Sequence, residues 1–323
     1  MAFRGSESVI IVADALHIPL ADNTVQCVVT SPPYWGLRDY GVDGQLGLEP
    51  TPEEYVGNMV TVFREVWRVL KDDGVLWLNL GDSYSAGSNN PSPKPSPKHS
   101  SGNVGRQRKV DNIRPKNLLG VPWRTALALQ SDGWYLRSDI IWAKPNPMPE
   151  SVKDRPTRSH EYIFLLTKSE RYYYDADAIK EPGSFAGPSG PGTQKTPHAQ
   201  GFGRRTREEE IVRQDKQRGH GDRWDAMSKE EQTDLMRNKR SVWNIATRPY
   251  PEAHYAVFPE EIPKICILAS TKKGDIVLDP FGGSGTTGRV AWSLGRKGVC
   301  MDISGEYAHN HMKQRMQVTV GMF

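Results

Sequence analysis

Apolar and polar residues follow two different spacings along the chain. Between Glu53 and Leu70 the apolar positions recur every three or four residues, which predicts an amphipathic helix with one buried face. Further helices are expected at 118–130, from Phe258 to Ser270 and through 291–294. Short apolar runs predict strands at 8–14, 25–30, 75–80, 136–142, 162–167, 275–279 and 297–301. Helices that alternate with short apolar strands predict an α/β fold with a largely parallel, wound sheet.

Two polar segments interrupt this alternation. Residues 83–117 are rich in Ser, Pro, Asn and Gly, and they include many basic side chains and only one acidic side chain, Asp111. Such a composition does not pack a core, so we expect a mobile basic loop. Residues 168–245 are also polar, and their arginines are interleaved with acids, so a solvated surface and a binding region are both open interpretations. Both segments interrupt the wound pattern, where binding loops usually lie.

Length and composition narrow the class of protein. A chain of 323 residues can bury a substantial core, and one large domain with an insertion fits it better than two equal domains. The sequence contains no run of 18 apolar residues and no signal-peptide pattern, so we expect a protein of the cytoplasm without a membrane partner. Cys27, Cys266 and Cys300 lie in apolar runs without metal spacing, which predicts reduced core thiols and no metal site. The net charge of +4 permits nucleic-acid binding without demonstrating it.

The stretch from Thr30 to Trp35 is the first candidate for chemistry. Ser31, Pro32, Pro33 and Tyr34 directly follow a predicted buried strand. Two consecutive prolines fix φ and remove two backbone donors, so we expect a rigid turn whose carbonyl groups face outward. A small hydroxyl, free carbonyls and aromatic rings at one strand end can hold a flat, amine-bearing ring. A stiff loop without function is the alternative for this stretch taken alone.

A glycine-rich turn at 280–287 is the second candidate. It follows the strand that ends at Asp279 and precedes a helix, which is how wound α/β proteins hold a nucleotide-like ligand. Asp302 ends the next strand and is placed to accept hydrogen bonds from both ribose hydroxyls. The turn fits neither the dinucleotide nor the Walker pattern, so a nucleoside ligand is favoured over a pyrophosphate.

These motifs resemble those of the DNA amino-methyltransferase family, which methylates cytosine at N4 or adenine at N6. Asp-Pro-Phe-Gly-Gly-Ser-Gly-Thr-Thr at 279–287 is similar to the family's S-adenosylmethionine-binding motif, and Ser-Pro-Pro-Tyr at 31–34 to its catalytic motif. The resemblance covers residues 8–80, 118–167 and 251–312. It implies a Rossmann-like fold of the class I methyltransferase type, with the catalytic motif before the cofactor motif, as in the family's beta arrangement.

The resemblance also divides the chain and assigns residues. It implies a catalytic half at 1–167, a target-recognition region inserted at 168–250 and a cofactor-binding half at 251–323. The residues expected to bind S-adenosylmethionine are Asp14, Phe258, Asp279, Pro280, Phe281, Gly283, Ser284, Gly285, Thr286 and Asp302. The candidate contacts to double-stranded DNA are Trp35, Lys144, Asn146, Arg204, Arg205, Arg218 and Arg223. Tyr34 is the candidate stacking platform for an extruded base. Trp35 or Trp142 is a possible second platform, although a core position is favoured for Trp142.

The first residue of the catalytic motif concerns the acceptor base. In the family this position is Ser in most cytosine-N4 enzymes and Asp or Asn in most adenine-N6 enzymes, so Ser31 favours cytosine. The Ser31 hydroxyl and the Pro32 carbonyl would accept hydrogen bonds from the exocyclic amine, whose lone pair then attacks the sulfonium methyl in a direct displacement. No Pro-Cys dipeptide offers the nucleophile that cytosine-C5 methylation needs.

Other functions remain open at this point. An adenine-N6 methyltransferase would use the same motifs with a different pocket. An RNA or small-molecule methyltransferase is disfavoured by the large polar segments, and a catalytically silent DNA-binding module by the two intact motifs. The resemblance favours a modification enzyme of a restriction system, and it leaves open whether a cognate restriction endonuclease exists.

Overall fold

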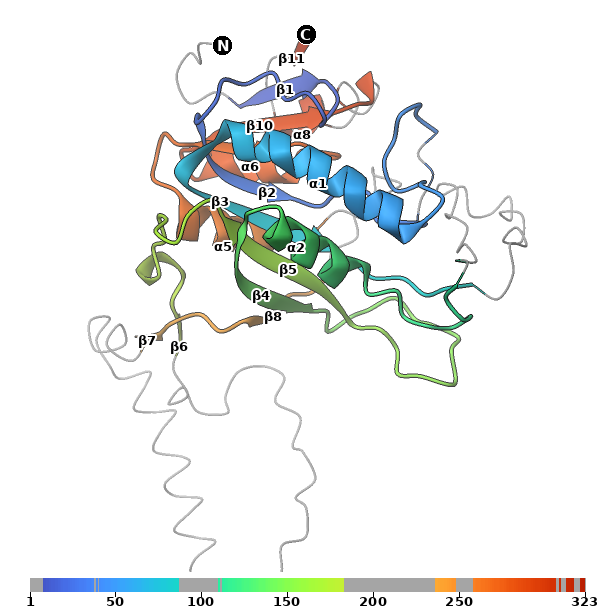
Figure 1. Ribbon diagram of the computed structural model, residues 1–323. Coiled ribbons are helices and arrows are strands. Elements are labelled where there is room, and N and C mark those ends of the chain that lie inside the picture. The colour runs from blue at the N-terminus through green and yellow to red at the C-terminus, as the bar shows by residue number, and fades with distance from the viewer. Residues whose placement is uncertain are drawn as a thin grey trace, which may run out of the picture. The chain divides into compact units, whose positions relative to one another are not determined.

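The chain divides into two compact units, Met1–Asp175 with Arg240–Phe323 and Ala176–Lys239. A computed structural model (Figure 1) describes the chain over residues 8–37, 39, 41–86, 110, 112–182, 236–247, 258–305, 308, 312–316 and 320–322. Most of the predicted basic loop at 83–117 lies outside these residues, as do Arg204, Arg205, Arg218 and Arg223.

The larger unit is built on one twisted sheet whose strand order is β11-β1-β10-β9-β2-β3-β5-β4-β8. All described pairings are parallel except those of β5, which runs antiparallel to β3 and β4. The strands are β1 (Val9–Val12), β2 (Val25–Thr30), β3 (Leu70–Leu80), β4 (Tyr135–Ala143), β5 (His160–Thr167), β8 (Val242–Asn244), β9 (Ile276–Asp279), β10 (Lys297–Asp302) and β11 (Val320–Met322). The prediction of a mostly parallel wound sheet is confirmed.

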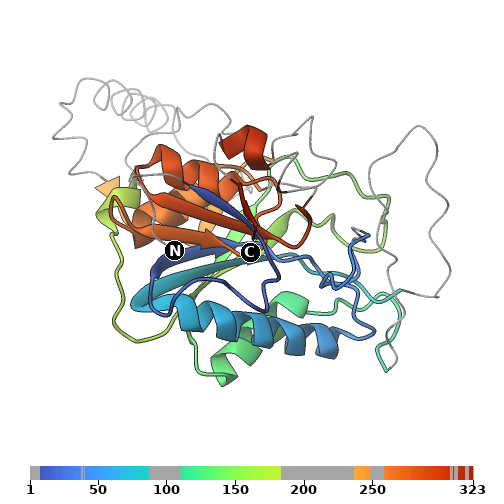
Figure 2. The same ribbon diagram turned by 90° about the horizontal axis from the view of Figure 1, so that it is seen from above.

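Helices cover both faces of the sheet (Figure 2). They are α1 (Pro52–Val69) and α2 (Val121–Ser131) on one face and α5 (Glu261–Ser270), α6 (Thr286–Ser293) and α8 (Lys313–Met316) on the other. The predicted apolar face of α1 is the buried one, because Tyr55, Met59, Phe63 and Val66 are fully buried against strand residues such as Leu76. The helix begins at Thr51, whose side chain caps it by accepting from the Glu54 amide at 3.2 Å.

Strand β3 is longer than the sequence predicts. The dipeptide Asp73-Gly74 favours a turn and the apolar run predicts a strand only from Val75, but β3 begins at Leu70, directly after α1. Leu70 pairs with Val25, and a bulge in the register before Cys27 absorbs the intervening residues. Local turn signals were therefore overridden by strand pairing.

The two candidate motifs end neighbouring strands. Strand β2 lies between β9 and β3, so the residues that follow β2, β9 and β3 emerge side by side at the carboxyl edge of the sheet. Helix α6 can lie close to β10 because a Cβ on Gly298 would stand only 2.7 Å from the Gly288 backbone. Strands β8 and β11 add sheet edges that the sequence patterns did not reveal, and β8 belongs to the larger unit although it falls inside the predicted recognition region.

The smaller unit contributes three short described elements. These are a 3-10 turn at Asp177–Ile179, β6 (Glu181–Pro182) and β7 (Met236–Arg237), with β6 and β7 paired antiparallel. Glu181 forms ion pairs with Arg237 at 3.2 Å and with Lys239 at 3.6 Å. The unit's limits at 176 and 239 lie within the predicted recognition region of 168–250.

Candidate active site

The Ser31–Tyr34 turn follows β2 as predicted. One hydrogen bond to α1 and one to the loop before α1 hold this part of the chain in place. Pro33 does not present its carbonyl outward, because this oxygen accepts a hydrogen bond from the Tyr55 hydroxyl of α1 at 3.0 Å. Trp35 is only 2% exposed and its indole nitrogen donates to the Glu49 carbonyl at 3.0 Å. Among the described residues no hydrogen bond to the Pro32 carbonyl is seen, so this oxygen can still accept one from a ligand.

The Tyr34 hydroxyl is the centre of a buried polar cluster. It donates to Glu161 Oε2 at 2.7 Å and accepts from Asn79 Nδ2 at 2.7 Å and from Ser31 Oγ at 3.2 Å. Asn79 Nδ2 also lies 3.0 Å from Glu161 Oε2, and Lys144 Nζ contacts the other carboxylate oxygen. Burial raises the pKa of Tyr34 well above its usual range, and the nearby Glu161 charge adds to this rise.

Gly81, directly after β3, makes room for the Tyr34 ring. A Cβ at this position would stand 2.6 Å from Tyr34 Cε2 and 2.9 Å from Cδ2. The ring is therefore positioned by its hydroxyl at one end and by the bare backbone of Gly81 along its side.

Asp279 connects β2, which leads to the Ser31–Tyr34 turn, with the glycine-rich turn. Its Oδ1 accepts from Thr30 Oγ1 at 2.7 Å and from the Phe281 amide at 3.1 Å, and its Oδ2 accepts from Thr287 Oγ1 at 2.8 Å. Burial raises the pKa of Asp279 to about 6, although the three donors oppose this rise. The carboxylate is 2% exposed, so its described contacts lie within the protein, and its predicted contact with the cofactor stays a prediction.

Asp302 and the glycine-rich turn form an open cradle. Asp302 accepts from the Gly283 amide at 3.2 Å and from the Ser304 amide at 2.9 Å, and burial raises its pKa to about 6. Gly283 and Gly285 both have positive φ, and a Cβ on Gly283 would meet only the Phe281 carbonyl, at 3.9 Å. The space beside Gly283 is thus open for a ligand to approach, whereas a Cβ on Gly285 would stand 2.7 Å from Met316 Sδ.

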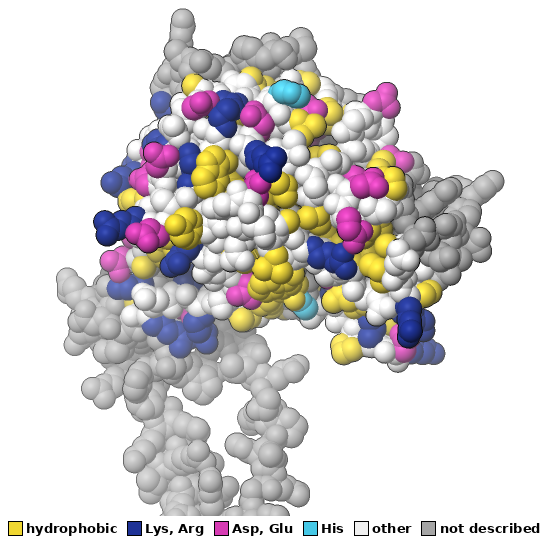
Figure 3. Space-filling model, in the orientation of Figure 1, with side chains coloured by type: hydrophobic (Ala, Val, Ile, Leu, Met, Phe, Trp, Pro, Cys, Tyr) yellow, Lys and Arg dark blue, Asp and Glu magenta, His cyan; other side chains and the backbone are white. Residues whose placement is uncertain are grey.

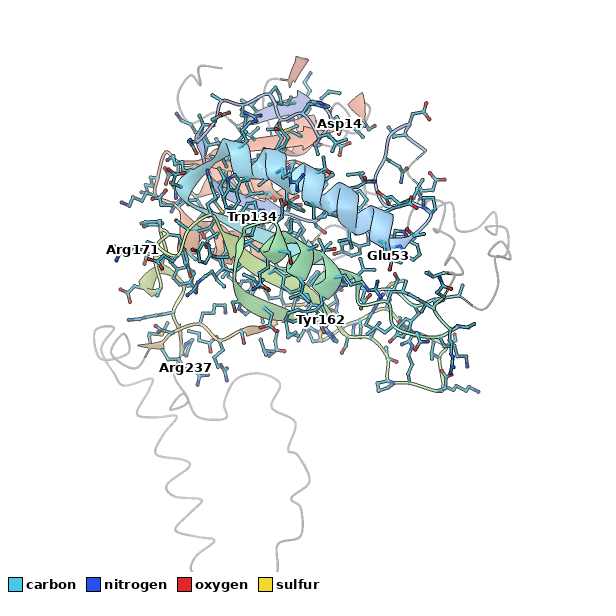
Figure 4. All side chains as sticks on the ribbon, in the orientation of Figure 1. Asp14, Glu53, Trp134, Tyr162, Arg171 and Arg237 are labelled. Carbon is cyan, nitrogen blue, oxygen red and sulfur yellow. The ribbon has the colours of Figure 1, made fainter. Side chains whose placement is uncertain are left out.

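The remaining predicted cofactor residues lie within the glycine-rich turn, directly after β1 or ahead of α5. Asp14 follows β1, the strand beside β10, and its side chain accepts from the Leu16 amide at 2.9 Å (Figure 4). Pro280 is buried, and Ser284 Oγ lies 3.2 Å from Thr286 Oγ1 within the turn. Phe258 is half-buried ahead of α5. Their contacts with a cofactor stay predictions.

Three predicted base or DNA contacts are engaged within the protein. Lys144 Nζ lies 4.2 Å from the centre of the Trp142 ring, in addition to its ion pair with Glu161. Trp142 itself is 3% exposed and donates to the Ile245 carbonyl, which confirms its core position. Asn146 exchanges two hydrogen bonds of 2.9 Å with the Thr247 backbone. A DNA contact by Trp35 stays a prediction and requires its ring to leave the packed position described above.

A cleft beside the catalytic turn is lined by residues of both charges. Its walls are Trp35, Gly36, Leu37, Asp82, Ser83, Tyr84, Glu150, Arg155 and Arg158. Asp82 accepts from the Gly120 and Val121 amides, both at 3.1 Å, and so caps the start of α2. The Arg155 guanidinium lies 4.1 Å from the centre of the Tyr84 ring and pairs with Glu150 at 2.6 Å.

Comparison with known protein families shows to which family the chain belongs. The sequence profile of the DNA methylase family N6_N4_Mtase matches residues 25–313. This chain belongs to the DNA methylase family. The type II methyltransferase M.SmaI of Serratia marcescens is 46% identical over 301 residues, which span 93% of this chain and 87% of that protein. The type II methyltransferase M.Cfr9I of Citrobacter freundii is 44% identical over 296 residues, spanning 91% of this chain and 83% of that protein.

Solved structures share the fold of this DNA methylase. The cytosine-N4-specific PvuII DNA methyltransferase aligns with a TM-score of 0.60 at 16% identity, covering 98% of this chain and 95% of that one. A candidate DNA modification methylase of Thermus thermophilus, complexed with S-adenosyl-L-methionine, aligns with a TM-score of 0.58 at 20% identity, covering 98% of each chain. The expected class I methyltransferase fold is confirmed.

Among the described residues no group of three or more His, Cys, Asp and Glu side chains is arranged to hold a metal ion. No helix in the described part of this DNA methylase is long and apolar enough to cross a membrane.

Sequence reasoning missed Asn79, Gly81 and Glu161. Asn79 lies near the carboxyl end of β3, Gly81 directly follows β3, and Glu161 lies near the start of the antiparallel β5. Asn79 within an otherwise apolar run was a usable signal, because a buried amide needs partners. Glu161 carried no such signal, since only the pairing of β5 with β3 brings it to the carboxyl edge.

Proposed function

We propose that this DNA methylase transfers a methyl group from S-adenosylmethionine to the exocyclic N4 of cytosine in a specific sequence of double-stranded DNA. The observation that carries the proposal is the adjacency of the two turns. Ser31 follows β2, the glycine-rich turn follows β9, and the hydrogen bond of 2.7 Å between Thr30 and Asp279 joins them. A base amine at Ser31 and a cofactor in the glycine cradle would therefore share one edge of the sheet.

The cradle fits S-adenosylmethionine. Gly283 leaves space for close approach, and Asp302 offers carboxylate oxygens for ribose hydroxyls. This cofactor supplies a methyl group on a positively charged sulfur. A related fold from Thermus thermophilus holds the same cofactor, which supports the assignment.

The chain's own residues prepare the acceptor nitrogen. Ser31 Oγ and the Pro32 carbonyl would accept the two amine hydrogens, which favours a pyramidal nitrogen with a localised lone pair. Tyr34, fixed by Glu161 and Gly81, would stack against an extruded base. The proton leaves after methyl transfer, when the nitrogen is cationic and strongly acidic, so no strong base is needed.

Ser31 at the first position of the motif supports cytosine over adenine. The similar M.SmaI and M.Cfr9I proteins are type II methyltransferases, which supports a role as the modification enzyme of a restriction system acting on DNA in the cytoplasm. A cognate endonuclease would then act separately on the same sequence.

The test is product analysis. Purified protein is incubated with duplex DNA and S-adenosylmethionine, the DNA is digested to nucleosides, and the methylated nucleosides are identified by mass spectrometry. We expect N4-methylcytosine, and none from a Ser31→Ala variant. Finding N6-methyladenine alone would show the adenine enzyme instead, and finding no cofactor-dependent methylation would support a silent DNA-binding module.

A further inference from the structure

The polar cluster around Tyr34 has a defined direction of hydrogen bonding. The carboxylate of Glu161 can only accept while it is ionised, so the Tyr34 hydroxyl donates to it at 2.7 Å. Asn79 Nδ2 can only donate, and it lies 2.7 Å from the Tyr34 oxygen, 3.0 Å from Glu161 Oε2 and 3.4 Å from Ser31 Oγ. The Tyr34 oxygen is left with capacity for one more donor, and Ser31 Oγ lies 3.2 Å from it.

Lys144 fixes the far end of this chain of hydrogen bonds. Its ammonium group contacts Glu161 Oε1, and the two side chains are only 18% and 16% exposed. The carboxylate therefore has donors at both oxygens, Lys144 at Oε1 and Tyr34 together with Asn79 at Oε2. With the ammonium group already at Oε1, Glu161 presents Oε2 as the acceptor to which the Tyr34 hydroxyl donates.

This direction of hydrogen bonding determines whether the Ser31 hydroxyl can accept a hydrogen bond from a ligand. When the Ser31 hydrogen is donated to Tyr34, Ser31 Oγ keeps two lone pairs as acceptors. Asn79 Nδ2, at 3.4 Å, can take one of them, which leaves the other for a ligand. An exocyclic amine needs an acceptor at this point, because a hydroxyl that donated to the nitrogen would occupy the lone pair that must attack.

We propose that Glu161 is a positioning residue that, through Tyr34, orients the Ser31 hydroxyl as a hydrogen-bond acceptor for the base amine. This inference rests on the proposed function and names residues of the same site. It separates two roles of Tyr34: the ring faces the base, and the hydroxyl transmits the orientation.

The test is a double-mutant cycle with Tyr34→Phe and Glu161→Gln, in which the single-turnover rate of methyl transfer to duplex DNA is measured. Tyr34→Phe keeps the ring and removes the link, whereas Glu161→Gln replaces an acceptor-only group by one that can also donate. We expect each variant to lose about ten-fold in rate, which is about 1.4 kcal/mol in barrier. The double variant should lose no more than the worse single variant, because both break the same chain.

Controls separate this role from general loosening of the fold. Glu65→Gln removes a carboxylate that pairs with Arg68 at 2.8 Å on α1, and it should leave the transfer rate unchanged. Cofactor and DNA dissociation constants of the Tyr34 and Glu161 variants should stay within about two-fold of wild type, a change too small to account for the rate. Multiplicative losses in the double variant, or full rate in either single variant, would overturn the inference. If the wild type methylates no DNA, the proposed function itself fails.

A different observation concerns Met148, which is 85% exposed on the segment after β4. The segment leaves the carboxyl end of β4, which runs parallel to β3 on either side of the antiparallel β5. It therefore emerges at the same edge as the Ser31–Tyr34 turn and projects beyond the sheet (Figure 1). Met148 follows Lys144 by four residues, a span of at most about 14 Å, and Lys144 already touches the catalytic cluster.

The neighbours of Met148 are held on both sides. Asn146 is bound to Thr247 by two hydrogen bonds of 2.9 Å, and Glu150 pairs with Arg155 at 2.6 Å. Pro147 and Pro149 flank Met148 directly and restrict the backbone between these anchors. An apolar side chain is thus presented to solvent from a fixed position.

We also propose that Met148 is an apolar wedge that enters the DNA at the base step from which the target cytosine is extruded. Apolar side chains that insert between base steps offset part of the unstacking cost, which is a few kcal/mol. This inference likewise rests on the proposed function, and its ligand is a stack of base pairs.

The test compares two DNA substrates. Met148→Ala should lower the methylation rate of a fully paired duplex by about ten-fold, equivalent to about 1.4 kcal/mol. It should leave the rate unchanged when the target cytosine faces an abasic site, because that base is already loosened. Val152→Ala, which truncates another exposed apolar side chain of the same segment, is the matched control and should be neutral on both substrates. Equal losses on both substrates, or none on the duplex, would overturn this wedge, whereas an inactive wild type would overturn the proposed function.

Discussion

Gly81 shows how a single residue without a side chain sets the geometry of the acceptor pocket. Because a Cβ there would stand 2.6 Å from the Tyr34 ring, Gly81→Ala must displace the ring or its hydroxyl from Glu161. We expect methyl transfer to fall by about ten-fold or more while cofactor affinity is kept. Single-turnover rates and calorimetric cofactor titration would measure the two effects.

The matched control for that substitution is Gly57→Ala. Gly57 lies within α1, and a Cβ there would meet nothing within 4 Å. Alanine in place of a helical glycine should stabilise the fold by up to about 1 kcal/mol without changing the transfer rate. If both glycine variants lose activity equally, the ring-seating role of Gly81 is wrong.

The proposed contact between Asp302 and the cofactor ribose predicts that cofactor binding depends on pH. Burial raises its pKa from 3.8 to about 6, so the carboxyl is protonated below that pH and ionised above it. An ionised carboxylate is the stronger acceptor for ribose hydroxyls, so affinity for S-adenosylmethionine should rise between pH 5 and 7, about one unit either side of that pKa, and then level off.

Calorimetric titration across this pH range would check the expectation, with Asp302→Asn as the comparison. The variant should bind weakly and without the rise. The pH dependence of folding stability has the opposite sign. Between about pH 4 and 6 the Asp302 carboxyl keeps its proton in the folded state, whereas the unfolded state releases it. This group's contribution to the free energy of unfolding should therefore fall as pH rises from about 4 to about 6. An affinity that falls with rising pH would contradict the role given to Asp302.

Among the elements, α6 is joined to β9 and β2 by one buried hydroxyl. Thr287 Oγ1 lies 2.8 Å from Asp279 Oδ2 and 3.2 Å from the Val29 carbonyl. Thr287→Val keeps the shape and leaves a buried carboxylate oxygen without a donor, so it should lower the free energy of unfolding by about 1–3 kcal/mol. Urea unfolding followed by circular dichroism would measure it.

Ser293→Ala serves as the comparison on the same helix. Its hydroxyl bonds the Val290 carbonyl near an exposed helix end, so its removal should change stability by less than about 0.5 kcal/mol. Equal changes in the free energy of unfolding in the two variants would show that the hydrogen bond between Thr287 and Asp279 contributes no more to stability than an exposed one.

At the scale of the whole molecule, methyl transfer and sequence recognition should be separable. Pro182 of β6 and Met236 of β7 are register partners in an antiparallel pair, so a short Gly-Ser loop can replace residues 183–235. The shortened protein should bind S-adenosylmethionine with unchanged affinity and lose methylation of the specific site, because the arginines of the predicted recognition region are removed. Calorimetry and mapping of methylated sites would measure both, and specific methylation by the shortened protein would place recognition elsewhere.

Figure 3 shows one face of the molecule, and the charges of its described side chains bear on DNA binding. Among the described side chains on this face, basic and acidic groups are interspersed rather than gathered into one basic region. Duplex DNA is held mainly through its phosphates, which favours a concentrated basic surface.

Much of the fold could be predicted from the chain alone. The spacing in α1, the apolar runs of β2, β9 and β10 and the glycines at 282–285 are local signals, and each produced the expected element. Local signals failed at β3, whose early start depends on pairing with β2, and at β8 and β11, which are too short to stand out before they pair.

The sequence by itself determined the two chemical motifs, Ser31 to Tyr34 and Asp279 to Thr287, because a rigid proline turn and a glycine-rich turn are encoded by adjacent residues. Only the tertiary structure decided what stands around them. Asn79 and Gly81 at the end of β3 and Glu161 in β5 are all far from Tyr34 in the chain, and strand order alone brings them to one edge with it. Hydrogen bonds and steric contacts act over a few ångströms in space, and no local pattern records which distant residues the fold will bring that close.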